Sequence, residues 1–324
     1  MSKSIFITGK IPEVGIRMLM EKGYTVDINP KNSIATQKQI ISFLKKKPYD
    51  AVLTLLTDPI AMAVFDAAPS VKLYANYATG FDNIDIVEAK KRGIKVTNAP
   101  TDMSTEAVAE HTIALMFALA ARIVEADEFV RRGKYKGWQA MNFIGTDILG
   151  KTLGLIGAGR IGERVAYYCK GLGMKIIYSD VVRNDRLEKE YGASYCGSVE
   201  EALKTADIVS LHVPLLDSTK HLINEARLRL MKPTSFLINT SRGPVVDEEA
   251  LEKALKQRII SGAALDVFEF EPKITSGLTK LDNVILTPHI ASASMEARNQ
   301  MAEIAVQNII DFLESGKPNN IVNP

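Results

Sequence analysis

The chain has little of several features that mark particular protein classes. Its two cysteines, Cys169 and Cys196, are too few for a disulfide framework or a cysteine metal array. The net charge is only +2, with no basic cluster, so neither nucleic acid nor a membrane surface is an expected partner. The uncharged stretch at residues 112–121 is too short to span a bilayer, and the N-terminus lacks the apolar core of a signal peptide. We expect a cytoplasmic protein without a metal site.

The remaining composition is that of an ordinary globular protein. Hydrophobic residues make up 46% and charged residues 24% of the 324 positions. This length suggests about two domains. Strand-like and helix-like segments alternate almost throughout, which favours parallel sheets covered by helices. The sequence therefore predicts an α/β fold.

We predict the individual elements from hydrophobic periodicity and capping signals. Expected strands lie at residues 4–8, 25–28, 51–54, 73–76, 95–97, 152–156, 174–178, 208–213, 235–239, 260–266 and 284–287. Expected helices include residues 12–22, 37–45, 248–256 and 294–314, and the pattern Ser198–Glu201 has the form of a capping box that opens another. A single long helix over residues 104–131 is expected to connect two α/β blocks.

A glycine-rich turn follows the strand that begins at Thr152. Gly157 permits the tight turn, Gly159 lets the backbone approach a pyrophosphate, and Gly162 lets the next helix pack closely. Asp180 ends the following strand, about 20 residues further on, where a carboxylate that binds ribose belongs. The alternative is an ordinary glycine turn between two elements. The strand and helix on either side favour a dinucleotide site, with phosphates at the helix N-terminus.

Three later segments place functional groups where a strand gives way to a loop. They carry Arg242, then Asp266 and Glu271, then His289. Ligands of open parallel sheets bind outside the carboxyl ends of strands, so these groups are expected to converge. Arginine offers a planar fork to a carboxylate, histidine exchanges a proton near neutral pH, and a carboxylate beside it favours the charged imidazole and its tautomer. Each residue alone would ordinarily be a solvated surface group, but together they suit hydride transfer between a nicotinamide and a 2-keto or 2-hydroxy acid.

Several ordered motifs in combination make the chain recognisable. They are the glycine loop, Ser241-Arg242-Gly243-Pro244-Val245-Val246-Asp247, Asp266-Val267-Phe268 with Glu271-Pro272, and Thr287-Pro288-His289-Ile290. The combination resembles the D-isomer-specific 2-hydroxyacid dehydrogenases over essentially the whole chain. Asn76-Tyr77-Ala78-Thr79-Gly80-Phe81-Asp82-Asn83-Ile84-Asp85 is most similar to the glyoxylate/hydroxypyruvate reductases of that family.

The resemblance implies a role for each matching residue. Arg242 would bind the substrate carboxylate, His289 would act as acid and base, and Glu271 would be its partner. Leu55 and the backbone amides of Thr79 and Gly80 would also contact the substrate. The implied cofactor contacts are Thr105, Gly157, Ala158, Gly159, Arg160, Ile161, Gly162, Asp180, His212, Val213, Pro214, Thr219, Thr240 and Asp266.

The resemblance also implies the domain organisation. Two Rossmann-like, doubly wound parallel-sheet domains would face each other across a cleft. A flavodoxin-like substrate domain would comprise residues 1–100 and 290–324, and an NAD-binding domain residues 101–289. Catalysis would occur in the cleft, with domain closure, and the product would be the D-hydroxy acid.

Substrate and cofactor choice are less constrained by the sequence. Thr79 stands where glyoxylate reductases more often have valine, and its hydroxyl either contacts a polar substrate or faces its own loop. Asp180 would repel the 2′-phosphate of NADP, which favours NAD, although Arg183 and Arg186 lie nearby. Ala291 also departs from the family's usual glycine. A D-lactate- or phosphoglycerate-type dehydrogenase and a dinucleotide-sensing regulator remain alternatives, and a methyltransferase would leave the arginine, glutamate and histidine unexplained.

The remaining histidines and the single tryptophan have plainer interpretations. His111 is expected to be structural, His221 to be a loop or surface residue, and His212 to pack on the cofactor side. Trp138 lies in a loop after the long helix, either packed within its own chain or at a dimer contact. The apolar side chains of this region predict a homodimer.

Overall fold

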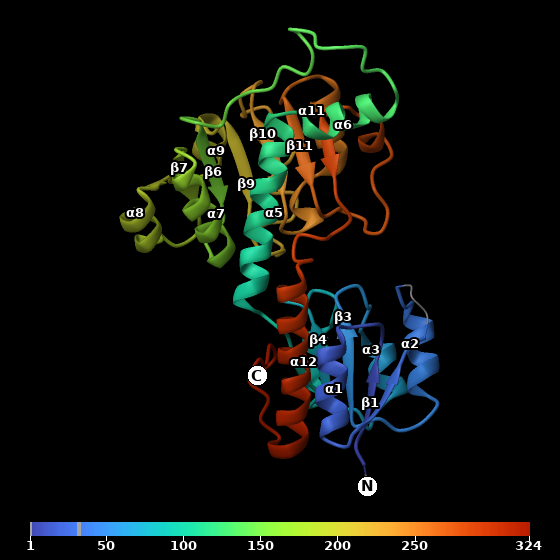
Figure 1. The fold of residues 1–324 in the computed structure, drawn as a ribbon. Helices are drawn as coiled ribbons and strands as arrows, with labels where there is room; N and C mark the ends of the chain where they lie inside the picture. Colours follow the sequence, from blue (N-terminus) through green and yellow to red (C-terminus); the bar gives the residue numbers. More distant parts are fainter. Residues whose placement is uncertain (1, 31–33) are drawn as a thin grey trace. The chain divides into compact units, whose positions relative to one another are not determined.

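The computed structural model describes residues 2–30 and 34–324. The chain divides into two compact units: unit 1 comprises Met1–Ser104 and Ala293–Pro324, and unit 2 comprises Thr105–Ser292. Helix α5 (Asp102–Ala120) begins in unit 1 and continues into unit 2. Figure 1 colours the chain by residue number, so that the first and last segments of unit 1 can be followed separately.

Within the described part of unit 1, strands form a parallel sheet in the order β2-β1-β3-β4-β5. The β1–β2 pairing aligns Ser4 with Thr25. The elements of this unit, in chain order, are β1 (Ser4–Ile7), α1 (Glu13–Glu21), β2 (Thr25–Ile28), α2 (Gln37–Leu44), β3 (Ala51–Leu55), α3 (Met62–Ala67), β4 (Leu73–Tyr77), α4 (Ile86–Lys91), β5 (Lys95–Thr97) and α12 (Met295–Ser315).

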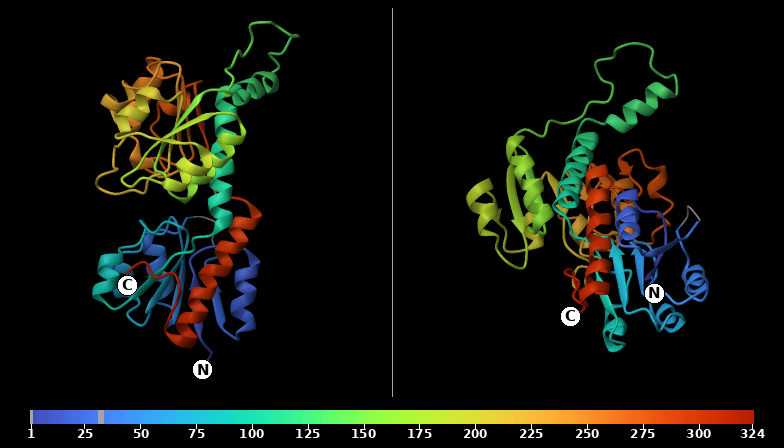
Figure 2. Two further views of the ribbon diagram at one scale, coloured as in Figure 1. Left: turned by 90° about the vertical axis from the view of Figure 1, so that its left-hand side faces the viewer. Right: turned by 60° about the horizontal axis from the view of Figure 1, so that its bottom comes forward.

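Alternation along the strands of unit 1 builds two apolar layers. Ile5 and Ile7 pack on one face with side chains of α1 and α12, whereas Phe6 packs on the other face with side chains of α2 and α3. Successive strand side chains point to opposite faces, so one apolar strand serves both layers. Figure 2 shows α12 running beside α1 in both views, which brings the C-terminal segment onto the N-terminal sheet.

Unit 2 has a larger parallel sheet of the same kind, and all of its residues are described. The strand order is β12-β11-β10-β9-β6-β7-β8. The elements after α5 are α6 (Ile123–Arg131), β6 (Thr152–Ile156), α7 (Arg160–Gly171), β7 (Lys175–Ser179), α8 (Asp185–Tyr191), β8 (Ser194–Tyr195), α9 (Val199–Thr205), β9 (Ile208–Leu211), α10 (Glu225–Leu228), β10 (Phe236–Asn239), the 3₁₀ helix η1 (Gly243–Val245), α11 (Glu248–Lys256), β11 (Gly262–Leu265), the 3₁₀ helix η2 (Leu278–Lys280) and β12 (Val284–Leu286).

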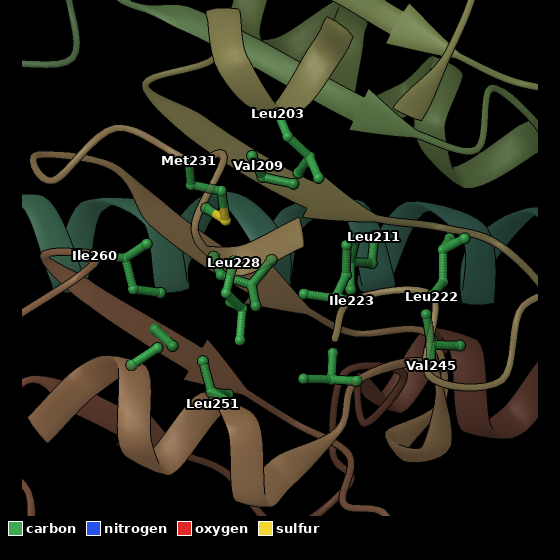
Figure 3. Close-up of a cluster of buried hydrophobic side chains, with 14 of the residues drawn as sticks. Leu203, Val209, Leu211, Leu222, Ile223, Leu228, Met231, Val245, Leu251 and Ile260 are labelled. Atoms are coloured by element: carbon green, nitrogen blue, oxygen red, sulfur yellow. The ribbon is translucent and has the colours of Figure 1, made fainter. Parts of the chain in front are cut away.

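The sheet of unit 2 is also covered on both faces. Val209 and Leu237 pack with side chains of α9, α10 and α11, in the cluster drawn in Figure 3. Ile208 and Ile238 point the other way, against α5 and α7. The two doubly wound parallel sheets confirm the predicted fold class. Because all strands are parallel, their carboxyl ends meet at one edge of each sheet.

The prediction of one helix over residues 104–131 is wrong. Two helices, α5 and α6, meet at a bend of 64°. Arg122 adopts a left-handed conformation between them, with φ of 54°. The carbonyl of Ala120 accepts the N–H of Thr146 at 2.9 Å, and Arg122 binds Glu125 instead of continuing α5. Contacts with a distant loop therefore end the helix, which apolar periodicity does not report.

Two smaller features refine the predictions. Ser198 caps α9 as expected, but the Glu201 carboxylate accepts the N–H of Gly197 at 2.9 Å, so the full capping box does not form. Among the described residues, no single helix is long and apolar enough to cross a membrane. Helices α5 and α6 meet those criteria only as a bent pair.

Candidate active site

The glycine turn after β6 is closely packed at two of its three glycines. Gly157 has φ of 99°, and a Cβ there would lie 2.6 Å from the carbonyl carbon of His212. A Cβ on Gly162 would lie 2.4 Å from the carbonyl oxygen of Gly157. Glycine is required at both positions, by the positive φ and by the close approach of backbone. The turn is thereby held against the end of β9.

Gly159 differs from these two because a Cβ there would meet no protein atom within 4 Å. It is the N-cap of α7 and has no side chain to accept the first N–H groups of the helix. Those groups and the positive end of the helix dipole suit an anion. The open space beside Gly159 and the N-terminus of α7 fit the pyrophosphate of a dinucleotide. Ala158, Arg160 and Ile161 lie in the same turn.

Asp180 follows β7 and lies beside the glycine turn. Its two carboxylate oxygens accept the N–H groups of Ala158 and Val181, each at 2.6 Å. Each oxygen keeps a further lone pair for a hydroxyl donor. This geometry suits hydrogen bonds from a ribose diol. The structure therefore brings Asp180 to the glycine loop, as the spacing predicted.

The two arginines near Asp180 are both engaged by carboxylates. Arg183 binds Glu188 at 2.6 Å, and Arg186 binds Glu163 at 2.8 Å. Each arginine would have to give up or share these contacts to bind a 2′-phosphate.

The segment after β9 carries His212, Val213, Pro214 and Thr219. His212 is half-buried, and burial lowers its pKa from 6.5 to about 3. Nε2 contacts the Ser210 hydroxyl at 2.9 Å. A neutral imidazole of this kind is no proton donor near pH 7, in agreement with its expected packing role. The Thr219 hydroxyl binds the Pro214 carbonyl at 2.6 Å and so shapes the loop itself.

His289 and Glu271 form a direct pair near the carboxyl ends of β12 and β11. Nδ1 of His289 lies 3.0 Å from Oε2 of Glu271, and the two side chains are 28% and 29% exposed. Burial raises the pKa of Glu271, but the hydrogen bond and charge of His289, the N–H of Phe268 and the charge of Arg242 outweigh it, so the pKa lies below its usual value. An ionised carboxylate only accepts, so Nδ1 carries the proton and Nε2 is left for exchange with a ligand.

Asp266 holds the loop that carries His289. This carboxylate is fully buried and accepts the N–H groups of Ile290 at 2.9 Å and Ala291 at 2.7 Å. The Asp266 carbonyl accepts the N–H of His289 itself at 2.8 Å. His289 has φ of 56°, a conformation that costs free energy unless its surroundings hold it. Asp266 thus acts on the position of His289 through the backbone.

Arg242 lies on a loop that is clamped by the last residue of β10. The buried side chain of Asn239 donates to the Arg242 carbonyl at 2.9 Å and accepts the Ser241 N–H at 3.0 Å. A Cβ on Gly243 would lie 1.9 Å from the Phe268 carbonyl, so the loop packs directly on the segment that leads to Glu271. The structure therefore places Arg242, Glu271 and His289 on three loops of unit 2 that contact one another.

Thr240 and Thr105 occupy different surroundings within unit 2. The Thr240 hydroxyl lies 3.0 Å from that of Thr112 on α5. Thr105, in the first turns of α5, is where unit 2 begins. Neither position adds an ionisable group to the site.

Leu55, Thr79 and Gly80 belong to unit 1, where side-chain hydrogen bonds join their loops, and the buried carboxylate of Asp58 accepts the Leu55 N–H at 2.6 Å. The Asn83 side chain donates to the carbonyls of Leu55 and Asp58, each at 3.1 Å. Asn76 donates to the Gly80 carbonyl at 2.9 Å and to Asn83 at 3.0 Å. The network holds the end of β3 against the loop after β4.

The hydroxyl of Thr79 faces its own unit. It lies 3.5 Å from the Ser104 hydroxyl, and the Thr79 carbonyl accepts from Asn98 at 2.7 Å. Ser104 belongs to the first turn of α5 and not to the Thr79 loop, and Thr79 itself is exposed. Thr79 and Gly80 keep their expected loop position after β4.

The structure gives partners to two histidines, His111 in its structural position on α5 and His221 in its loop. His111 lies 3.3 Å from the Thr287 hydroxyl and 3.6 Å from the Asp266 carboxylate, so it packs against the anchor of the His289 loop. His221 is only partly exposed and binds Glu269 at 2.6 Å. Both contacts join residues far apart in sequence, so no short motif indicates them.

Comparison with known proteins agrees with this geometry. Residues 113–291 match the family described as D-isomer specific 2-hydroxyacid dehydrogenase, NAD binding domain. A glyoxylate reductase of Korarchaeum cryptofilum is 48% identical, over 100% of this chain and 96% of its own length.

Two solved structures are similar over nearly their whole length. The NADPH-dependent glyoxylate/hydroxypyruvate reductase of Sinorhizobium meliloti, in complex with NADP and malonate, has a TM-score of 0.85 and 30% identity and covers 99% of this chain and 97% of its own. The D-lactate dehydrogenase of Aquifex aeolicus, complexed with NAD and lactic acid, has a TM-score of 0.85 and 34% identity and covers 99% of each chain. The chain belongs to the D-isomer-specific 2-hydroxyacid dehydrogenase family and is an NAD(P)-dependent oxidoreductase.

Proposed function

We propose that the protein reduces a small 2-keto acid, of the glyoxylate or hydroxypyruvate type, to the D-2-hydroxy acid with NADH. The observation that carries the proposal is the 3.0 Å contact between His289 and Glu271, with Arg242 close enough for its charge to lower the pKa of Glu271. The substrate class is supported by relatives named glyoxylate reductase at 48% and 49% identity.

Each residue of the site has a separate role in the proposed reduction. Bound NADH would supply the hydride that adds to the keto carbon. Protonated His289 gives its Nε2 proton to the carbonyl oxygen, so that C=O becomes CH–OH. Glu271 keeps the proton on Nδ1 and balances the imidazolium charge, and Arg242 holds the substrate carboxylate with its planar fork. The backbone N–H groups of Thr79 and Gly80 are proposed to bind the same carboxylate, with Leu55 as an apolar contact.

The cofactor residues follow from the glycine loop. We assign the pyrophosphate to the N-terminus of α7 beside Gly159, and the adenosine ribose to Asp180. Hydrogen bonds to Asp180 and the ion pairs of Arg183 and Arg186 support NAD as the preferred form. Domain roles follow the same division: unit 2 binds the cofactor, and unit 1 contributes to substrate binding.

Initial rates with glyoxylate, hydroxypyruvate, pyruvate and phosphohydroxypyruvate, each with NADH and NADPH, test this proposal. We expect the highest kcat/KM with glyoxylate or hydroxypyruvate and NADH, and the D product by chiral chromatography. A preference for pyruvate would favour the D-lactate dehydrogenase alternative. NADH binding without turnover of any keto acid would instead favour a dinucleotide-sensing protein.

A homodimer is part of the proposal. One apolar face of α5 is buried in the core of unit 2, through Leu115, Met116 and Leu119. That face is therefore not available to a second chain. Apolar side chains beyond it remain exposed, with Trp138 at 85% and Met141 at 78%. An exposed apolar surface of this kind marks a contact region. Light scattering should give twice the chain mass of 35.6 kDa at micromolar concentration; a mass of one chain would contradict the dimer.

The location follows from the same residues. Cys169 and Cys196 are both free thiols and both buried, which suits a reducing compartment. We propose the cytoplasm, to be checked by cell fractionation.

A further inference from the structure

A second imidazole–carboxylate pair lies on the loop that carries Glu271. Nε2 of His221 lies 2.6 Å from Oε1 of Glu269, two residues before Glu271 in the chain. The Glu269 side chain is only 9% exposed, whereas His221 is 39% exposed. A carboxylate this buried needs partners, so the pair is more than a solvated surface contact.

Glu269 is also held from a second side, by Glu248 at the start of α11. The Glu269 carboxylate accepts the N–H of Glu248 at 3.3 Å, and the Glu269 N–H donates to the Glu248 carboxylate at 2.5 Å. The fully buried Glu248 carboxylate further accepts the N–H of Thr275 at 3.1 Å. These reciprocal bonds hold both ends of the 269–275 segment, with Glu271 between them.

The same histidine is joined to the loop of Arg242 through its backbone. The His221 N–H donates to the Pro244 carbonyl at 2.8 Å, and Ile223 donates to the Val245 carbonyl at 3.0 Å. Gly243 packs on the backbone of Phe268 and Glu269. His221 therefore stands where the segments of Arg242 and of Glu271 meet.

Backbone conformation marks His221 in the same way as His289. Their φ angles are 49° and 56°, in the left-handed region that few residues other than glycine adopt. Such conformations persist where the surroundings hold them, and they cluster at functional sites. Both of these histidines bind a glutamate of one loop, at positions 269 and 271.

We infer that His221 and Glu269 are positioning residues for the catalytic pair. They hold the loop so that the Glu271 carboxylate faces Nδ1 of His289, and they touch neither substrate nor cofactor themselves. The inference rests on the proposed keto-acid reduction. It predicts that loss of the His221–Glu269 contact acts through Glu271 and not on cofactor binding.

The test begins with His221→Ala and Glu269→Gln. Each variant should lower kcat on the order of tenfold at saturating NADH and glyoxylate, the size of coupling found between neighbouring residues of one network. The Kd for NADH, from quenching of nucleotide fluorescence, should stay unchanged. His221→Gln should restore most of kcat, because its amide N–H reaches the position of Nε2 and can donate to Glu269.

A double-mutant cycle with Glu271→Gln separates positioning from general destabilisation. If His221 acts through Glu271, then adding His221→Ala to the Glu271→Gln variant should lower the kcat of that variant only slightly. Additive losses, or a kcat of His221→Ala equal to that of the wild type, would overturn the inference. Asp282→Asn is the control, since it removes an exposed 2.9 Å contact with Arg258 in the same unit, before the start of β12 and so at the opposite edge of the sheet from these loops, and it should leave kcat unchanged.

A spectroscopic readout keeps the inference independent of turnover. The ¹⁵N resonance of His289 Nδ1 reports its hydrogen bond to Glu271. It should move in His221→Ala, return in His221→Gln and stay in place in Asp282→Asn. An unmoved resonance in His221→Ala would refute the positioning role even if no keto acid is reduced, whereas absent turnover in the wild type with a moved resonance would refute only the proposed reaction.

Discussion

The two units share one architecture but divide their polar groups differently. All four histidines of the chain, His111, His212, His221 and His289, lie in unit 2 and none in unit 1. Two of them, His212 and His289, lie just after β9 and β12, at the carboxyl ends of these strands. The loops of unit 1 are joined by the amides of Asn76 and Asn83, the hydroxyl of Thr54 and one buried carboxylate, that of Asp58. In the function proposed above, unit 2 supplies the proton donor and unit 1 supplies backbone groups that bind the substrate.

The largest effect is expected at His289. His289→Ala removes the positioned acid, which typically contributes about 10²- to 10⁴-fold in rate, so kcat should fall by that factor while NADH binding stays the same. NADH oxidation at saturating keto acid measures it. Turnover near that of the wild type would place the proton donor elsewhere and break the assignment of proton chemistry to unit 2.

The next effect concerns Glu271 and the pH profile. Because the pKa of Glu271 is lowered, its carboxylate is ionised throughout the neutral range. Its own titration therefore does not change the rate of reduction near pH 7. Glu271→Gln removes the charge that favours the imidazolium of His289. Reduction should then decline at lower pH than in the wild type, with a kcat loss on the order of tenfold or more. A profile that stays in place would remove Glu271 from the mechanism.

A variant in unit 1 should act on binding instead. Asn83→Leu removes both donors to the Leu55 and Asp58 carbonyls and loosens the substrate loops. We expect KM for the keto acid to rise by roughly tenfold, with a smaller change in kcat and some loss of stability. Asn319→Ala, which removes an exposed amide contact with Asp311 in the same unit, is the control. A fall in kcat alone would contradict the division between the units.

A further prediction concerns the preference of unit 2 for NADH over NADPH, which we assign to Asp180. Asp180→Ala removes the carboxylate that would repel a 2′-phosphate, so the ratio of kcat/KM for NADH to that for NADPH should narrow by roughly fivefold to tenfold, in line with the loss of one hydrogen-bonded charge. Adding Glu188→Gln to this variant releases Arg183 from its ion pair and should narrow the NADH-to-NADPH ratio slightly further. A wild-type enzyme that favours NADPH would overturn the preference.

The smallest effect is a stability change at His212. Its folded-state pKa is lowered to about 3, so between pH 6.5 and 3 the unfolded chain binds a proton that the folded chain does not. The contribution of His212 to the free energy of unfolding therefore has its full value above pH 6.5 and falls by about 1.4 kcal/mol per pH unit below it. His212→Gln should lessen that slope between pH 6.5 and 5 in urea unfolding, and it should leave the slope at pH 8 unchanged. Equal slopes in both proteins at low pH would argue against the buried neutral imidazole.

Local signals predicted most of the strands and the nucleotide turn. Short apolar runs such as that of β9 must be buried on both faces of a parallel sheet, so their pattern is visible in sequence. Gly157, Gly162 and Asp180 lie within one strand–turn–helix–strand unit, where spacing alone brings them together. The break at Arg122 escaped prediction, because it depends on a hydrogen bond between Ala120 and Thr146 across a loop.

The sequence by itself determined the doubly wound α/β class, the dinucleotide turn and the identity of Arg242, Glu271 and His289 as candidates. These features depend on the periodicity of buried side chains and on residue types at short spacing. Only the tertiary structure decided which partners those residues have. Asp266 holds the His289 loop, Asn239 holds Arg242, and His221 binds Glu269, because parallel strands distant in the chain end at one edge of the sheet and bring their loops within hydrogen-bond reach.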